Sequence, residues 1–186
     1  IINNEWIENC FNAENIPYKN NNFDAIFTID TILHLNNPKK FFLEVGRVLK
    51  PGGLLIINDI NLSLLHRFFI KRLKHLQIKP SIDLYKYDNS MSEYVFNSNP
   101  LNLEILLNNN KKFKKIFNLS KVSEKKVEFL TYILSGGVSA NFKIINIPLW
   151  ILNIINYLDK IILFFLPNIF ALSRNINFIK SKTNIN

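Results

Sequence analysis

Two nearly continuous apolar runs, separated by an amphipathic stretch, dominate the first third of the chain. Residues 23–29 read FDAIFTI and residues 54–57 read LLII. Apolar runs of this length, rich in Ile and Phe, are typical of strands that are buried on both faces of a parallel sheet. Between them, apolar residues recur at helical spacing from Phe41 to Leu49, with charged residues opposite. The pattern predicts a strand, a helix and a second parallel strand joined by a right-handed crossover.

Turn residues mark both ends of the predicted helix. We expect the helix to start at Asn37 and Pro38, because asparagine caps free backbone N–H groups and proline suits the first helical position. The sequence Pro51-Gly52-Gly53 is expected to end it, since glycine tolerates the positive φ found there.

The rest of the chain shows weaker patterns. A basic amphipathic helix, a short helix and a long apolar helix stopped by Pro167 are predicted at residues 62–76, 101–107 and 148–166. Strands are predicted at residues 6–13, 113–122, 126–134 and 175–180, and an irregular connection or lid at 80–100. The sequence contains no internal repeat, so we expect a single domain over residues 1–186.

Length and composition are those of one globular domain. The chain has 186 residues, 48% of them hydrophobic and 20% charged, enough to bury a core. Cys10 is the single cysteine, which excludes an intramolecular disulfide and suits a reducing cytoplasm. The net charge of +9 favours acidic partners such as nucleic acid or anionic lipid, although the abundance of Asn, Ile and Lys is also typical of an AT-rich genome.

Four short segments occur in a characteristic order between residues 12 and 53. They read NAENIPY at 12–18, FDA at 23–25, LHL at 33–35 and LKPGG at 49–53. In these segments the chain resembles the class I S-adenosylmethionine-dependent methyltransferases, with the small-molecule "type 11" group as the nearest branch. The resemblance implies an α/β fold with a doubly wound, mostly parallel Rossmann-like sheet and helices on both faces. It also implies S-adenosylmethionine as the cofactor.

By this resemblance, the site lies where loops follow the predicted strands, since ligands of open parallel sheets bind beyond the carboxyl ends of the strands. Asn12, Ala13 and Glu14 would hold the adenine, with Asn12 in place of the usual aspartate. Asp30 and Thr31 would border the sulfonium, and Asp30 or His34 would assist the acceptor as a base. A loop position for Asn12, a capped turn for Asp30 and a structural contact for His34 are the alternatives.

The glycine-rich loop that opens this family's fold has no counterpart in the sequence. The five glycines stand at positions 46, 52, 53, 136 and 137. We therefore expect a fragment of a longer methyltransferase that begins ahead of the third strand and lacks the first two. Such a fragment would bind the cofactor weakly or not at all, and it would expose a sheet edge.

These features predict methyl transfer from S-adenosylmethionine to an O, N or C atom of a small molecule in the cytoplasm. Residues 62–115 would form an acceptor-side insertion or lid, and the helix at 148–166 would suit an apolar acceptor. The alternative is a non-catalytic module of the same fold that binds a protein partner or an anionic membrane surface. For the helix at 148–166, packing against the sheet is preferred over peripheral contact with a membrane surface. Both are preferred over a membrane span, because Asp159 and Lys160 would each cost about 3 kcal/mol at the bilayer centre.

Neither a metal nor nucleic acid is expected as a partner. His66 and His75 do not share a ligand spacing, and neither has a cysteine nearby. The basic run at residues 111–115 is better explained as a solvated turn than as a phosphate site. Nucleic-acid amino-methyltransferases often carry Asn/Asp-Pro-Pro-aromatic after the fourth strand, and here that position reads Asp30-Thr31-Ile32-Leu33.

Overall fold

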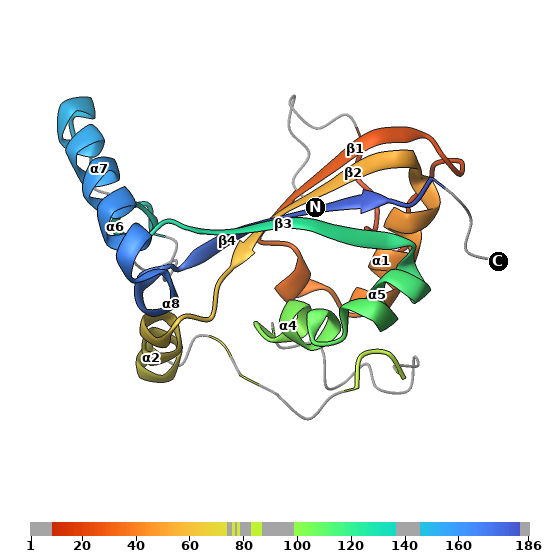
Figure 1. The fold of residues 1–186 in the computed structure, drawn as a ribbon, viewed down its shortest axis with the longest axis horizontal. Helices are drawn as coiled ribbons and strands as arrows, with labels where there is room; N and C mark the ends of the chain where they lie inside the picture. The colour runs from red at the N-terminus through yellow and green to blue at the C-terminus, as the bar shows by residue number, and fades with distance from the viewer. Residues whose placement is uncertain are drawn as a thin grey trace.

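The computed structural model of the protein describes residues 9–73, 76, 78, 83–86, 99–136 and 146–182. Its elements follow one another as β1 (Phe23–Ile29), η1 (Ile32–His34), α1 (Pro38–Val48), β2 (Leu49–Ile60), α2 (Leu64–Leu73), α4 (Asn102–Leu107), α5 (Asn110–Phe117), β3 (Leu119–Val127), α6 (Leu130–Leu134), α7 (Leu149–Phe165), α8 (Pro167–Phe170) and β4 (Ser173–Lys180). The strands form one sheet in the order β1-β2-β4-β3 (Figure 1). The predicted α/β class is confirmed.

The predicted strand-helix-strand unit is present as β1, α1 and β2. β1 and β2 are parallel, whereas β4 is antiparallel to both β2 and β3. Three of the four strands therefore point the same way, and their carboxyl ends lie at one end of the sheet. The Asn37 side chain accepts a hydrogen bond from the Lys40 N–H at 2.9 Å, and Pro38 is the first residue of α1, as predicted.

Pro51-Gly52-Gly53 does not end the helix. α1 ends at Val48, and these three residues lie inside β2. Gly52 has a φ of +82°, and the pairing of β1 with β2 shifts register between Phe23 and Ala25. The positive φ expected of glycine is thus used in an irregular start of a strand, where a side chain would be strained.

The main core lies between the sheet and the helices α1, α4 and α5, which cover the same face (Figure 1). Phe42 and Val45 of α1 pack there with Phe113 and Phe117 of α5, all of them buried. No helix of the described ranges covers the opposite face at β1, where Phe27 is 60% exposed. The prediction that residues 23–29 are buried on both faces is therefore wrong: β1 is the edge strand of a sheet with one open face.

A helical excursion separates β3 from β4 and carries α6, α7 and α8. It leaves the sheet at Glu128 and returns at Leu172, whose N–H donates to the Glu128 carbonyl at 2.8 Å. α7 contacts α6 and α8, and α8 also contacts α2, so the four helices lie together at one end of the molecule (Figure 1). A second apolar cluster, which includes Tyr132 and Leu172, fills the space beneath them.

The four weaker predictions of α2, α4, α7 and β4 are confirmed within a few residues. The strands predicted at residues 113–122 and 126–134 are wrong in part, since these ranges contain α5, β3 and α6. Phe113 and Phe117 are four residues apart and share one helix face, and Asn118 ends the helix with a φ of +57°. Of the strand predicted at residues 6–13, residues 9–13 are not in a strand and the rest lies outside the described residues. Most of the connection at 80–100 also lies outside them.

Candidate functional site

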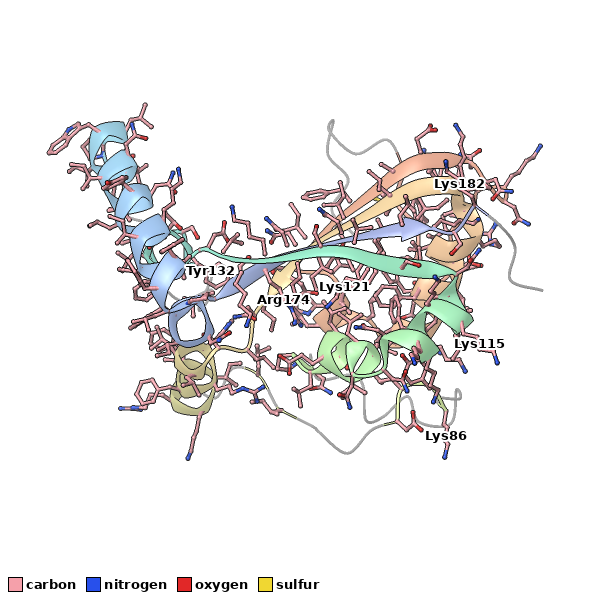
Figure 2. The ribbon with its side chains drawn as sticks, viewed as in Figure 1. Lys86, Lys115, Lys121, Tyr132, Arg174 and Lys182 are labelled. Atoms are coloured by element: carbon pink, nitrogen blue, oxygen red, sulfur yellow. The ribbon has the colours of Figure 1, made fainter. Side chains whose placement is uncertain are left out.

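The carboxyl ends of β1, β2 and β3 and the start of β4 bring four polar side chains to one end of the sheet. Asp30 follows β1, Asp59 lies at the end of β2, Arg174 lies at the start of β4, and Tyr132 lies in α6. Figure 2 shows Tyr132 and Arg174 at this end, where the sheet meets the helical excursion. Of these, the sequence singled out Asp30 alone.

Asp30 sits in a strained turn. Its φ of +46° is uncommon for a residue other than glycine, and such strain is often found at functional sites. The Asp30 N–H donates to the Asn58 carbonyl at 2.9 Å, and the Thr31 hydroxyl donates to the Ile29 carbonyl at 2.9 Å. The Oδ1 atom of Asp30 is buried and has no hydrogen-bond partner among the described residues. Burial raises the pKa of this carboxyl, and the nearby His34 opposes the rise.

Asp59 is buried directly beside this turn. Its carboxylate accepts hydrogen bonds from the Ile60 N–H at 2.8 Å and the Ile32 N–H at 3.3 Å, so it ties η1 to the end of β2. Burial raises the pKa of Asp59 to about 6, and the negative charge of Asp30 adds to the rise while Arg174 opposes it. The sequence holds one sign of this role. Asp59 stands two positions after Ile57 and therefore on the same face of the strand, which points into the core.

Arg174 stands opposite Asp59 in the pairing of β2 with β4. One guanidinium nitrogen lies 3.5 Å from a Glu124 carboxylate oxygen, while Nε and Nη2 are buried without a hydrogen-bond partner among the described residues. These two nitrogens can therefore donate further hydrogen bonds. Buried donors without partners are rare in proteins, which makes this guanidinium a candidate ligand contact.

Tyr132 closes the same region from α6. Burial raises the pKa of its hydroxyl, and the carboxylates of Asp30, Glu128 and Asp59 raise it further. The hydroxyl therefore stays protonated and remains a hydrogen-bond donor at neutral pH. The His66 ring lies 6.0 Å from the Tyr132 ring, and its Nδ1 is within hydrogen-bond distance of the Asn61 and Leu172 carbonyls, at 2.9 and 3.1 Å. His66 is thus held within the fold.

The loop at residues 12–15 lies against the segment that follows β1. The Asn12 side chain accepts from the Glu14 N–H at 2.8 Å, and Glu14 accepts from the Asn37 N–H at 2.7 Å. Glu14 therefore holds the loop at the start of α1. Asn12 is exposed, and Ala13 packs partly against the core.

Arg47 and Glu44 of α1 hold the next part of this loop in place. The Arg47 guanidinium donates to the Tyr18 carbonyl at 2.7 Å and the Ile16 carbonyl at 2.8 Å, and it pairs with Glu44 at 2.7 Å. Glu44 in turn accepts from the Ile16 N–H at 2.9 Å. The helix pattern placed both residues on the polar face of α1 but gave no sign of what they bind.

Comparison with known proteins identifies relatives of the N-terminal part of the chain. Residues 3–57 match the family model described as a methyltransferase domain. A segment of 59 residues is 39% identical to a mitochondrial ubiquinone biosynthesis O-methyltransferase of Dictyostelium discoideum. This segment covers 32% of this chain and 17% of that protein. A segment of 55 residues is 42% identical to norajmaline N-methyltransferase of Rauvolfia serpentina. This segment covers 30% of this chain and 18% of that protein. The matches thus span less than a fifth of the length of these curated relatives.

Comparison with solved structures gives partial likenesses, among them two methyltransferases. A SAM-dependent methyltransferase of Methanosarcina mazei gives a TM-score of 0.48 at 14% identity, over 93% of this chain and 66% of that chain. Phosphoethanolamine N-methyltransferase 2 of Haemonchus contortus, solved with S-adenosyl-L-methionine, gives a TM-score of 0.38 at 16% identity, over 91% of this chain and 36% of that chain.

Proposed function

We propose that this protein transfers a methyl group from S-adenosylmethionine to an O, N or C atom of a small molecule, on the basis that residues 3–57 match a methyltransferase domain. The family match supports this reaction class, and S-adenosylmethionine is the cofactor that the resemblance of residues 12–53 to the class I enzymes implies. The observation that carries the proposal for this chain is the buried, unpartnered oxygen of Asp30 at the carboxyl end of β1. Ligands of parallel sheets bind at that end of a strand.

The residues present fit two parts of the cofactor. Asn12 and Ala13 would face the adenine: the Glu14 N–H is already bonded to Asn12, which leaves the Ala13 N–H as a backbone donor. Glu14 would act by fixing this loop to the start of α1. Asp30 and Thr31 would border the sulfonium, since a buried carboxylate oxygen without a donor suits a neighbouring cation. Bound there, S-adenosylmethionine would supply a methyl group on a sulfonium that leaves as a neutral thioether.

The acceptor would lose its proton to this chain. Asp30 has a raised pKa because it is buried, so it is a stronger base than an exposed carboxylate, and His34 lies close enough to influence it. Either group would take the proton of an acceptor hydroxyl or amine. Asp59 would act as a positioning residue, because both of its oxygens are occupied by the Ile60 and Ile32 N–H groups. Methyl transfer itself depends mainly on in-line positioning of the acceptor.

The acceptor pocket would form beyond this end of the sheet. Residues 62–115, which contain α2 and α4, would act as the acceptor-side insertion, and the helical excursion would complete it. The Tyr132 hydroxyl and the unused Arg174 nitrogens are polar groups available there for orienting an acceptor. The apolar cluster beside them favours an acceptor with an apolar part.

The alternative is a non-catalytic module of the same fold that binds a protein partner or an anionic membrane surface. The exposed apolar side chains of α7 support it. This alternative predicts that the protein binds its partner whether or not Asp30 is intact.

The test is photo-crosslinking of S-adenosylmethionine labelled with tritium on its methyl group, which captures weak binding. We expect label on the protein, competed by S-adenosylhomocysteine and reduced about tenfold by Asn12→Ala, equivalent to about 1.4 kcal/mol. Asp24→Asn, an exposed aspartate on β1, is the matched control and should label normally. Asp30→Asn and His34→Gln are then compared for transfer to a panel of phenols and amines.

Three outcomes would count against the proposal or a part of it. Absence of any competable label would remove the cofactor site, and the non-catalytic module would then be preferred. Equal labelling of wild type and Asn12→Ala would remove the adenine assignment. Transfer that is unchanged in both Asp30→Asn and His34→Gln would exclude these two residues as the base.

A further inference from the structure

The outer face of α7 carries a continuous row of exposed apolar side chains. This outer stripe consists of Trp150, Ile154, Tyr157, Ile161 and Phe164, which are three or four residues apart and so share one helix face. Trp150 is 65% exposed and Phe164 is 79% exposed. Soluble proteins rarely leave a large contiguous apolar patch in water unless it is an interaction site.

Asp159 determines which face of α7 points outward. It is buried, and its carboxylate accepts hydrogen bonds from the Leu130 N–H at 2.8 Å, the Thr131 N–H at 3.0 Å and the Thr131 hydroxyl at 2.8 Å. These bonds hold one side of α7 against the start of α6. Ile161 of the outer stripe lies two residues further on and therefore almost opposite on the helix. The stripe cannot turn inward unless these bonds break.

A cavity of about 510 Å³ lies along one edge of the outer stripe, between α7 and the end of β3. Its cations are Lys125, Lys126 and Lys160, and its acids are Glu128 and Asp159, whose carboxylate is already occupied by α6. Neither Lys125 nor Lys160 forms an ion pair within the described ranges. Phe164 belongs to the stripe and also lines the cavity. The cation-lined cavity and the stripe are thus adjoining parts of one surface.

α2 presents similar side chains at the same end of the molecule. It contacts α8, which contacts α7 (Figure 1). Leu64 and Phe68 of α2 are exposed, and Lys71 and Arg72 follow them at its exposed end. Apolar side chains next to lysine and arginine therefore occur on two neighbouring helices.

We propose that this end of the protein docks on an anionic phospholipid surface, with the outer stripe of α7 in the interface and lipid phosphates in the cation-lined cavity. Tryptophan, tyrosine and phenylalanine beside lysine are typical of helices that lie in a membrane interface. The net charge of +9 adds long-range attraction to an anionic surface. α7 has 17 residues, about 26 Å at the usual helical rise, and no helix of the described ranges has the length and hydropathy needed to cross a bilayer.

Charge favours lipid over a second copy of this chain as the occupant. Two copies joined through the outer stripe would bring two cation-lined cavities and two chains of charge +9 together, which is repulsive. An anionic surface neutralises the same lysines. Docking of this kind requires neither the cofactor nor an acceptor, so its test is independent of methyl transfer.

The experiment is co-sedimentation of the whole chain with vesicles of phosphatidylcholine, with or without about one-third phosphatidylglycerol. We expect binding to the anionic vesicles only, weakened by salt. Trp150→Ser combined with Phe164→Ser should weaken it at least about tenfold, because two large apolar side chains leave the interface. Lys125→Gln combined with Lys160→Gln should weaken it about tenfold as well. Phe27→Ser is the control, because Phe27 is also a highly exposed aromatic residue but lies on β1, outside the stripe, and this variant should bind like wild type.

Three results would overturn the proposal. The first is no binding to anionic vesicles, and the second is equal binding to neutral ones. The third is a loss of vesicle binding in Phe27→Ser as large as in the stripe variant, which would indicate nonspecific adsorption through exposed apolar side chains. Sedimentation equilibrium distinguishes the competing occupant: a dimer that the stripe variant abolishes, without vesicle binding, would assign the outer stripe to a second copy. Circular dichroism of each variant verifies that it is folded.

Discussion

Replacing Asp59 with asparagine should stabilise the protein at alkaline pH although it removes a side chain that makes two hydrogen bonds. Burial raises the pKa of Asp59 from 3.8 to about 6. The native state therefore holds this proton more tightly than the unfolded chain does. The wild-type stability falls as the pH rises between these two values, and it stays lower at every higher pH.

The magnitude follows from that shift. About 2 pKa units correspond to about 3 kcal/mol of destabilisation by ionised Asp59 at about pH 8, and about 1 kcal/mol at about pH 4.5. Asparagine keeps an acceptor for the Ile60 N–H but turns an amide donor toward the Ile32 N–H, which costs about 1 kcal/mol at any pH. Asp59→Asn should therefore be about 2 kcal/mol more stable than wild type at about pH 8 and equally stable at about pH 4.5.

Urea unfolding followed by circular dichroism at these two pH values measures both differences. Asp24→Asn is the control, because Asp24 is exposed and pairs with Lys50 at 2.8 Å on the surface. Its stability should change by less than about 0.5 kcal/mol in either direction. A variant Asp59→Asn that is less stable than wild type at about pH 8 would refute the reasoning, as would a difference that does not depend on pH.

Three further substitutions test other contacts of the fold. Gly46→Ala should lower the free energy of unfolding by about 2 kcal/mol or more, since a Cβ there would meet the Phe117 carbonyl oxygen and force α1 away from α5. The melting temperature should fall with it, and an unchanged melting temperature would contradict this close approach. Asp159→Ala should lower the urea midpoint of unfolding, because three backbone N–H groups at the start of α6 lose their acceptor at a cost of about 2 kcal/mol. A midpoint equal to that of wild type would show that water replaces the carboxylate as acceptor. Arg47→Gln should speed amide hydrogen exchange at Ile16 and Tyr18 about tenfold, with the strands unaffected. Exchange at the wild-type rate would show that the loop does not depend on Arg47.

The central unit of the fold was predictable because its signals are local. The cap at Asn37, the helical period through Phe41 and Phe42 and the apolar runs on either side each require only a few consecutive residues. The residues of the resemblance also lie in this part of the chain. For that reason β1, α1, β2 and the position of Asp30 could be read from the sequence.

The rest of the site depends on pairing between distant segments. Arg174 reaches Asp59 because β4 inserts between β2 and β3, and no local pattern indicates that order of strands. Tyr132 lies close enough to Asp30 for that carboxylate to raise the pKa of its hydroxyl, although the two residues are about a hundred positions apart in the chain. Phe113 and Phe117 were assigned to a strand, since a short apolar and lysine-rich segment fits both periods.

The hydrogen bond from the Leu172 N–H to the Glu128 carbonyl makes the helical excursion a separable cassette. Its two ends meet between paired strands, so the sheet closes there whatever the length of chain in between. Each doubling of that length would cost only about 0.6 kcal/mol in closure entropy. Lineages could therefore exchange, shorten or duplicate this cassette by recombination while β3 and β4 keep their register. The excursion, which carries the outer stripe, can then diversify faster than β1 and β2, whose ends position Asp30 and Asp59.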